Sequence, residues 1–334
     1  MKFFKALFNR EIVKLGLILF LTFLLQLIGP IFFADYPIPD AKEYKALVEF
    51  FRGQGAFTDA GVIWRGRVLV PLIASIFPFD PLISLRIVNI VFTLFCVVFF
   101  YQILSLLKFR NKERFLGIFL FIIAVPTITI GSTPLTDSAG LFFVVFSIYL
   151  YLRLDNKPKK FLLIGIILAI GVFSRESVLF IIPVLILWEI IEIGVSKNII
   201  KDIALKILLI GTLPLLSFIF IRILVPKSYL LDQISFSRLL ENLTVETFEA
   251  TTLATIGQLS VILIIGIFGN FTKVIKKSKK LWKLIIGAGG FLPELIMVYL
   301  IGPPGNRFFW IYFIFAIPFL LYSFSNLRVK DLKN

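Results

Sequence analysis

Long apolar runs separated by short basic segments dominate the pattern of this 334-residue chain. An apolar helix of about 20 residues crosses the hydrocarbon core of a bilayer, so such runs predict transmembrane helices. The runs lie at residues 14–33, 82–107, 115–131, 138–152, 161–173, 178–194, 203–225, 259–272, 284–301 and 308–327. The pattern therefore predicts an all-α fold, a polytopic transmembrane helical bundle of about ten spans, in which residues 1–334 form one integral membrane domain.

Two longer polar segments, 34–81 and 226–258, interrupt the apolar runs. In the first, apolar residues recur at helical spacing at Tyr44, Leu47, Val48 and Phe51. In the second, the same spacing is found at Phe236, Leu239, Leu240 and Leu243. Both patterns predict short amphipathic helices that lie in the membrane interface. Residues 68–79 are apolar but short, and we expect a re-entrant or interfacial piece there.

Asp40 stands at the start of the first interfacial helix. Asp40 and Glu43 have the spacing of a capping box, and Gly53 and Gly55 mark the end of the helix. Two interpretations of Asp40 follow. It is either only the cap of this helix, or a functional carboxylate at the lip of a membrane-facing site.

The composition narrows the chemistry. The chain is 59% hydrophobic, has no histidine and has a single cysteine, Cys96. A Ser–His or Cys–His nucleophile, a histidine-ligated metal and an internal disulfide are therefore excluded. Any catalysis by this chain must use carboxylates, Arg, Lys, Tyr or a bound cation.

The net charge of +15 is distributed unevenly along the chain. With both termini placed in the cytoplasm, 24 of the 35 basic residues but only 7 of the 20 acids fall in the inner segments. This distribution follows the positive-inside rule and places the two longer polar segments outside. The excess charge thus indicates a multi-pass protein of the cell membrane and contact with anionic lipid, and it needs no nucleic acid as a partner.

Several charges lie too deep in the predicted bundle to reach water. The run 161–173 covers only ~20 Å of a core of about 30 Å, which leaves Arg175 and Glu176 submerged. Asp137 lies ~24 Å from Arg153 along its helix and is submerged as well. Buried charges are costly unless they are paired or hydrated. We expect Asp137, Arg175 and Glu176 to line a polar cavity open to the outer leaflet. The alternative is an interior salt bridge of Arg175 with Asp137, which does not exclude a function.

Two further charges have open interpretations. Glu294 follows Pro293 and lies ~16 Å along the helix from Lys283, the nearest inner charge, and so near the middle of the membrane. It is either a carboxyl that packs between helices or a part of the site. Arg307 begins the last run, either as a side chain that reaches the membrane interface or as a ligand of substrate.

Such a cavity suits a phosphate-linked lipid substrate. Arginine binds phosphate through two parallel hydrogen bonds. A carboxylate at the lip of the cavity can take the proton from an acceptor hydroxyl, which attacks the anomeric carbon of a sugar while lipid phosphate leaves from the opposite face. This chemistry is an inverting glycosyl transfer.

The motifs that carry these residues are similar to those of a known family. They are Asp40 with Tyr44, the stretch Trp64-Arg65-Gly66-Arg67-Val68-Leu69-Val70-Pro71, the stretch Pro134-Leu135-Thr136-Asp137-Ser138-Ala139-Gly140-Leu141, Phe173-Ser174-Arg175-Glu176-Ser177, and Asn306-Arg307-Phe308-Phe309 before a span with Pro318. Their order resembles the GT-C class of polytopic glycosyltransferases, in particular prokaryotic proteins similar to mannosyltransferases that use polyprenyl- or dolichyl-phosphate sugars. The resemblance covers most of the first 190 residues and is weak beyond them.

The resemblance implies a hexosyl or mannosyl transferase whose active site faces outward. Its donor is a lipid-phosphate-linked sugar, and its acceptor is a glycan, a lipid or a protein. Asp40 is implied as the base, but many members carry an Asp-x-Asp pair there, whereas Asp35 and Asp40 are five residues apart. Asp35 therefore remains an alternative base, no metal ligand is assigned, and the use of a divalent cation stays open. The substrate-binding residues implied are Tyr44, Arg65, Arg67, Asp137, Arg175, Glu176 and Arg307.

Two other functions are compatible with the pattern. A lipid or small-solute transporter or flippase also has deep charges and broken helices, although here a charged path inward exists only through Glu294. A non-catalytic membrane scaffold is the other alternative, but it has no need of submerged Asp137, Arg175 and Glu176.

The predicted topology can be tested by cysteine labelling in intact cells. Cysteines placed in 226–258 are expected to react with a membrane-impermeant reagent, because that segment lies outside. Cysteines placed in 274–281 are expected to stay unreactive, and their labelling would overturn the topology.

Overall fold

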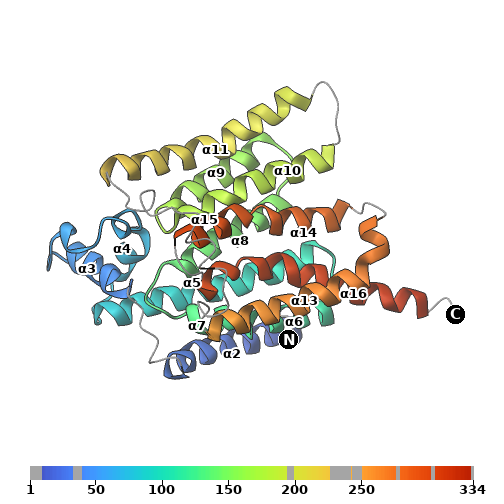
Figure 1. Cartoon of the computed structure of the whole chain (residues 1–334), viewed down its shortest axis with the longest axis horizontal. Helices are drawn as coiled ribbons and strands as arrows, with labels where there is room; N and C mark the ends of the chain where they lie inside the picture. The colour runs from blue at the N-terminus through green and yellow to red at the C-terminus, as the bar shows by residue number, and fades with distance from the viewer. Residues whose placement is uncertain are drawn as a thin grey trace, which may run out of the picture.

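The computed structural model of the protein is a bundle of helices (Figure 1). It describes residues 10–32, 40–193, 199–225, 242, 250–275, 279–301 and 305–331. All regular elements in these ranges are helical, which confirms the predicted all-α fold of membrane type.

The longer helices follow the predicted apolar runs. They are α2 (Arg10–Phe32), α5 (Pro81–Leu106), α6 (Asn111–Ile122), α8 (Asp137–Arg153), α9 (Pro158–Val172), α10 (Ile181–Ile193), α11 (Ile199–Leu224), α13 (Ala250–Ile275), α14 (Lys279–Gly289), α15 (Leu292–Ile301) and α16 (Tyr312–Asp331). Within the described ranges, 5 candidate spans are long and apolar enough to cross a membrane, and the apolar part of α16 is shorter. The membrane character is therefore confirmed, whereas the count of about ten spans is not.

Two predicted runs are broken in the structure. The run 115–131 divides into α6 and the short α7 (Val125–Ile130), in which Pro126 has no N–H to continue the first helix. The side chain of Gln258 bonds to the backbone groups at the break. It accepts a hydrogen bond from the Val125 N–H at 2.9 Å and donates one to the Ile123 carbonyl at 3.4 Å. Such side-chain bonds allow an interrupted helix inside a membrane bundle.

The second break divides the run 284–301 into α14 and α15. The chain turns at Gly290 and Phe291, and Pro293 follows at the start of α15. The break places Glu294 in the first turn of a new helix instead of the middle of a long one. A carboxylate in a first turn is favoured by the helix dipole.

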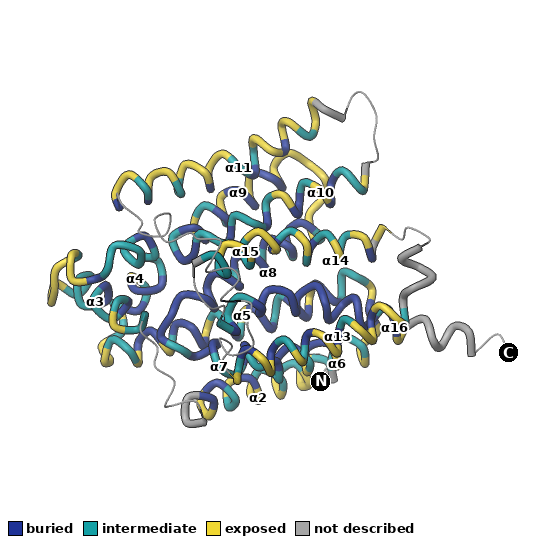
Figure 2. Tube along the Cα trace, in the orientation of Figure 1, coloured by how far each residue is buried: buried dark blue, intermediate teal, exposed yellow. Residues whose placement is uncertain are grey.

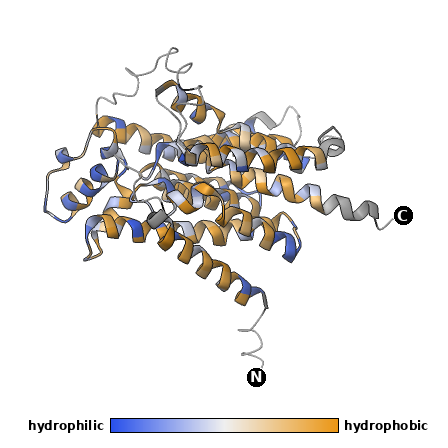
Figure 3. Ribbon diagram, turned by 60° about the horizontal axis from the view of Figure 1, so that its bottom comes forward, coloured by the Kyte–Doolittle hydropathy of each residue, from blue (hydrophilic) through white to orange (hydrophobic). Residues whose placement is uncertain are grey.

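Hydrophobic packing holds the bundle together, with α9 against α11, α5 against α8, and α13 against α16. The buried surface lies between the helices, whereas α2, α11 and α13 carry exposed faces (Figure 2). Those faces are apolar, and hydrophilic residues gather at the ends of the bundle (Figure 3). Exposed apolar faces of this kind are expected where helices contact lipid.

A small module covers one end of the bundle (Figure 1). It comprises α3 (Ala41–Phe51), α4 (Leu69–Ser75) and the 3₁₀ helices η1 (Phe57–Asp59) and η2 (Trp64–Gly66). The predicted amphipathic helix is α3, and its apolar residues Tyr44, Leu47 and Val48 are buried against α4 and α5. The apolar face of α3 thus attaches the module to helix α5 of the bundle.

The start of α3 differs from the prediction. The capping box of Asp40 and Glu43 is wrong, because the Asp40 side chain makes no cap hydrogen bond and Glu43 instead accepts from the Gly61 N–H at 2.6 Å. The end of α3 is as expected, with Gly53 in the left-handed region at φ 72°. The side chain of Asp40 is therefore available for another partner.

The second predicted interfacial helix, Phe236 to Leu243, lies outside the described residues, as does most of 226–249. Residues 250–258 belong to α13 and continue into its apolar part.

The contact between α9 and α11 gives a test of this packing. A Cβ at Gly165 would lie 2.4 Å from the backbone oxygen of Leu209, whereas nothing lies within 4 Å of one at Gly211. Gly165→Ala is expected to cost on the order of 1–3 kcal/mol, because overpacking moves the helices apart. Melting temperatures in detergent should fall for Gly165→Ala and stay unchanged for the matched Gly211→Ala; equal values would contradict this packing.

Candidate active site

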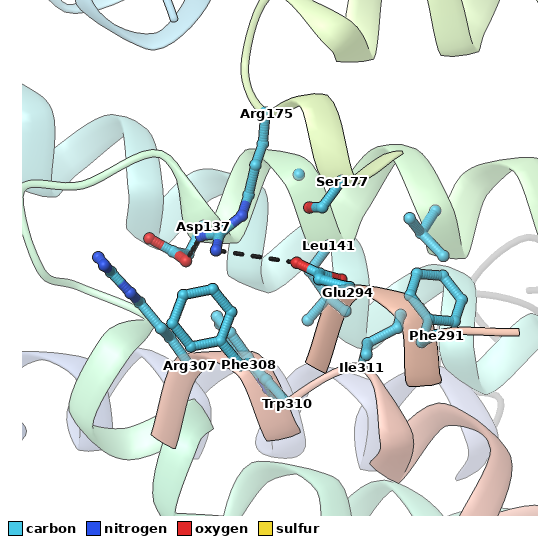
Figure 4. Close-up of a pocket in the computed structure, with 12 residues that line it drawn as sticks. Asp137, Leu141, Arg175, Ser177, Phe291, Glu294, Arg307, Phe308, Trp310 and Ile311 are labelled. Atoms are coloured by element: carbon cyan, nitrogen blue, oxygen red, sulfur yellow. Dashed lines mark ion pairs between the residues drawn. The ribbon is translucent and has the colours of Figure 1, made fainter. Parts of the chain in front are cut away.

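A polar cavity lies in the bundle beneath the module (Figure 4). Its charged side chains come from four elements: Asp137 begins α8, Arg175 lies between α9 and α10, Glu294 begins α15, and Arg307 lies in the 3₁₀ helix η6 (Asn306–Phe309). Phe291, Phe308 and Trp310 complete the wall together with aliphatic residues. The cavity encloses about 380 Å³, including its open mouth.

Arg175 is the central cation of this cavity. Its guanidinium forms an ion pair with Asp137 and lies 3.9 Å from Glu294 Oε1. Asp137 and Arg175 are both buried, at 6% and 8% exposure. Figure 4 shows Arg175 extending between the two carboxylates, with Phe308 below. The structure thus places Asp137 and Arg175 in one cavity and also pairs them with each other.

Glu176 lies elsewhere. It is outside the residues that line the cavity, and it pairs with Arg67 at 3.1 Å and with Arg222 at 3.7 Å. The reason is local, because Arg175 has an extended backbone (φ −163°, ψ 129°). Successive side chains of an extended segment point to opposite sides. The expectation that Glu176 lines the cavity is therefore corrected.

Glu176 belongs to a hydrogen-bonded chain that holds the module on the bundle. Arg67 donates to Glu176 and, at 3.1 Å, to the hydroxyl of Tyr44, which lies 3.2 Å from the Thr136 hydroxyl. Burial alone lowers the pKa of Arg67, but Tyr44 and the Glu176 carboxylate outweigh it, and the pKa is raised. Arg67 is therefore charged at any physiological pH. Tyr44 is only 1% exposed, and in this structure the polar groups of Tyr44 and Arg67 contact protein side chains.

Asp40 reaches the cavity through Arg307. Arg307 Nη1 lies 2.9 Å from Asp40 Oδ2, although the two residues are far apart in the sequence. Arg307 also lines the cavity, and its guanidinium lies over Phe308 at 5.1 Å, while that of Arg175 lies over the same ring at 5.0 Å. Two guanidiniums thus share one aromatic ring, a favourable arrangement for cations.

Arg65 takes no part in this geometry. Arg65 donates to the backbone carbonyls of Ala60 at 2.8 Å and Thr58 at 2.9 Å, and so braces the module. Asp35 lies outside the described residues. Among the described residues, no three Asp, Glu, His or Cys side chains are close enough to hold a metal ion.

The sequence left Glu294, Ser177 and Phe308 without an assigned role in the site. Glu294 had a visible signal, a carboxylate directly after a proline inside an apolar run, but a packing role explained it equally well. Ser177 lines the cavity and stands two residues after Arg175. Phe308 neighbours Arg307 in the sequence, and only the fold brings Arg175 to the same ring.

The arrangement combines anion-binding and hydroxyl-binding groups. Guanidinium groups bind phosphate, whereas carboxylates accept hydrogen bonds from hydroxyl groups. Burial between apolar and aromatic walls strengthens both kinds of interaction. A sugar joined to phosphate carries both groups that this cavity can bind.

Comparison with known proteins agrees with this chemistry. Residues 68–236, about half of the chain, match the dolichyl-phosphate-mannose-protein mannosyltransferase family. The chain belongs to this family. The resemblance to the GT-C class of membrane glycosyltransferases is therefore confirmed.

A solved structure shows the same fold. The oligosaccharyltransferase of Archaeoglobus fulgidus, tethered with an acceptor peptide containing the NVT sequon, superposes with a TM-score of 0.54 at 12% sequence identity. The similarity covers 95% of this chain and 50% of the oligosaccharyltransferase, so this chain spans about half of the length of that protein. No curated protein matches the chain in sequence.

The contacts of Arg175 predict that replacement of this residue by lysine impairs the protein. An ammonium group lacks the planar fork that contacts Asp137 and Glu294 together. Arg175→Lys is expected to lower sugar transfer on the order of tenfold or more although the charge is kept. Transfer rates of purified protein check this.

The matched control is Arg222→Lys. Arg222 pairs with Glu176 at 3.7 Å outside the cavity, so this change should leave transfer near its original rate. A similar loss in both variants would contradict a special role of Arg175.

Proposed function

We propose that the protein transfers a hexose, in the first place mannose, from a polyprenyl- or dolichyl-phosphate carrier to an acceptor on the outer face of the membrane, with inversion at the anomeric carbon. The observation that carries the proposal is the Asp40–Arg307 ion pair. It joins an acid on the module, which does not cap its helix, to a cavity that contains a second arginine.

The donor fits the cavity in chemical terms. Its phosphate is bound by Arg307 and Arg175, because guanidinium forms parallel hydrogen bonds to phosphate oxygens. The sugar hydroxyls donate to Asp137 and Glu294, and the apolar faces of the sugar lie against the aromatic wall. The prenyl chain extends into lipid, which the apolar outer faces of the bundle contact.

The chemical step needs one base and one stabilised leaving group. The Asp40 carboxylate takes the proton from an acceptor hydroxyl. The hydroxyl oxygen then forms a bond to the anomeric carbon, and the bond from that carbon to the phosphate oxygen breaks on the opposite face. Lipid phosphate leaves with the electron pair, and the arginines stabilise its charge.

The side of the membrane follows from charge. The basic residues are concentrated in the inner segments, at the end of the bundle away from the module. This excess supports a cytoplasmic position for both termini. The module and the mouth of the cavity then face outward, where a glycan, a lipid or a protein hydroxyl can serve as acceptor.

Asp40→Asn tests the base. Turnover is expected to fall on the order of 100-fold or more with folding intact, because asparagine cannot accept the proton. Purified protein incubated with polyprenyl-phosphate mannose, with transfer and release of the sugar measured, checks this.

The matched control is Asp80→Asn. Asp80 caps α5 by accepting from the Leu82 N–H at 2.9 Å, and asparagine caps about as well. That variant should keep normal transfer. If Asp40→Asn is active while Asp35→Asn is inactive, Asp35 is the base; if both are active, the proposed mechanism is wrong.

A further inference from the structure

The cations of the cavity are occupied by acids of the protein itself. Arg175 contacts Asp137 and Glu294, and Arg307 contacts Asp40. A phosphate that enters the cavity must therefore compete with a carboxylate for a guanidinium.

Arg307 is the easier of the two cations to exchange. Its side chain is 28% exposed, against 10% for Arg175, and one carboxylate contacts it in the described structure, against two for Arg175. Asp40 is also partly exposed, at 18%, so water can solvate it when it is released. Partly exposed ion pairs contribute little net free energy, which makes replacement by a doubly hydrogen-bonded phosphate feasible.

Among the described residues, Arg307 is the side chain that pairs with the Asp40 carboxylate. It does not cap α3, and it stands at the first position of the module, just before the helix begins. Its Oδ2 is the atom engaged by Arg307 at 2.9 Å. While this contact lasts, Arg307 engages Oδ2, and only Oδ1 is left to accept a proton from an acceptor.

We infer that donor phosphate exchanges with Asp40 on Arg307, so that donor binding unmasks the base. This inference rests on the proposed function and adds the order in which donor and acceptor engage the site. The donor binds first, its phosphate takes the guanidinium of Arg307, and Asp40 is released toward the acceptor. Arg175, held by two acids, keeps its place beside the same ring and also binds the phosphate.

A binding cycle with farnesyl phosphate tests the exchange on the full chain in nanodiscs. If Asp40 competes with phosphate, Asp40→Asn should bind farnesyl phosphate about three- to tenfold more tightly, the scale of a partly exposed ion pair. Arg307→Gln should bind it more weakly. In the Arg307→Gln background, Asp40→Asn should give no gain, because the contested cation is absent.

Two controls separate competition from a general charge effect. Asp59→Asn removes another carboxylate of the module, one that accepts from the Ala56 N–H and does not contact Arg307, and it should leave the affinity unchanged. Farnesol, which lacks the phosphate, should bind all variants alike. The exchange is overturned if Asp40→Asn does not tighten binding, or if its gain persists in the Arg307→Gln background.

The outcome is independent of whether Asp40 is the base. Tighter binding by Asp40→Asn with normal transfer would support the exchange and refute Asp40 as the base. Unchanged affinity with lost transfer would refute the exchange and leave the proposed function standing.

Discussion

The burial of opposite charges within an apolar bundle is the constraint on which this structure depends. Asp137 lies at the start of α8 and Arg175 just after the end of α9, and both side chains are buried in the bundle. Moving one such ion alone into a low-dielectric interior costs several kcal/mol, so each requires the other. Their pairing fixes how α8 meets the segment between α9 and α10, and it creates the polar cavity at the same point.

The same constraint explains one of the two broken helices. A continuous helix over 284–301 would bury Glu294 in its middle, whereas the break sets it in the first turn of α15, 3.9 Å from Arg175. At the second break, between α6 and α7, the side chain of Gln258 accepts a hydrogen bond from the free backbone N–H of Val125. Interruptions inside a membrane are tolerated where protein groups replace the missing backbone bonds.

Neighbouring residues divide two tasks at this site. Thr136 and Glu176 bond to the module through Tyr44 and Arg67, while the adjacent Asp137 and Arg175 line the cavity. The module is thereby hydrogen-bonded to the residues directly beside the charges of the cavity. This coupling gives Tyr44 and Arg67 a positioning role, which their motif alone did not distinguish from direct contact with substrate.

Much of the protein could be predicted from its sequence. The apolar runs predicted an all-α membrane fold, and their lengths predicted that Asp137 and Arg175 are buried together, because helix rise and bilayer thickness are local quantities. The order of short motifs predicted the GT-C class. The missing histidine limited the chemistry to carboxylates, arginines, lysines, tyrosines and bound cations.

Partner choice was decided only by tertiary structure. Asp40 had the local signature of a helix cap, yet its side chain pairs with Arg307, which reaches it from the opposite end of the chain. Glu176 had the same local setting as Arg175, but the extended backbone between them turned it to Arg67. The sequence pattern does not show which opposite charge a buried side chain pairs with. An ion pair depends on distance in space and on the other groups that compete for the same charge. The chain therefore determined which charges are buried, and the fold determined which of them meet.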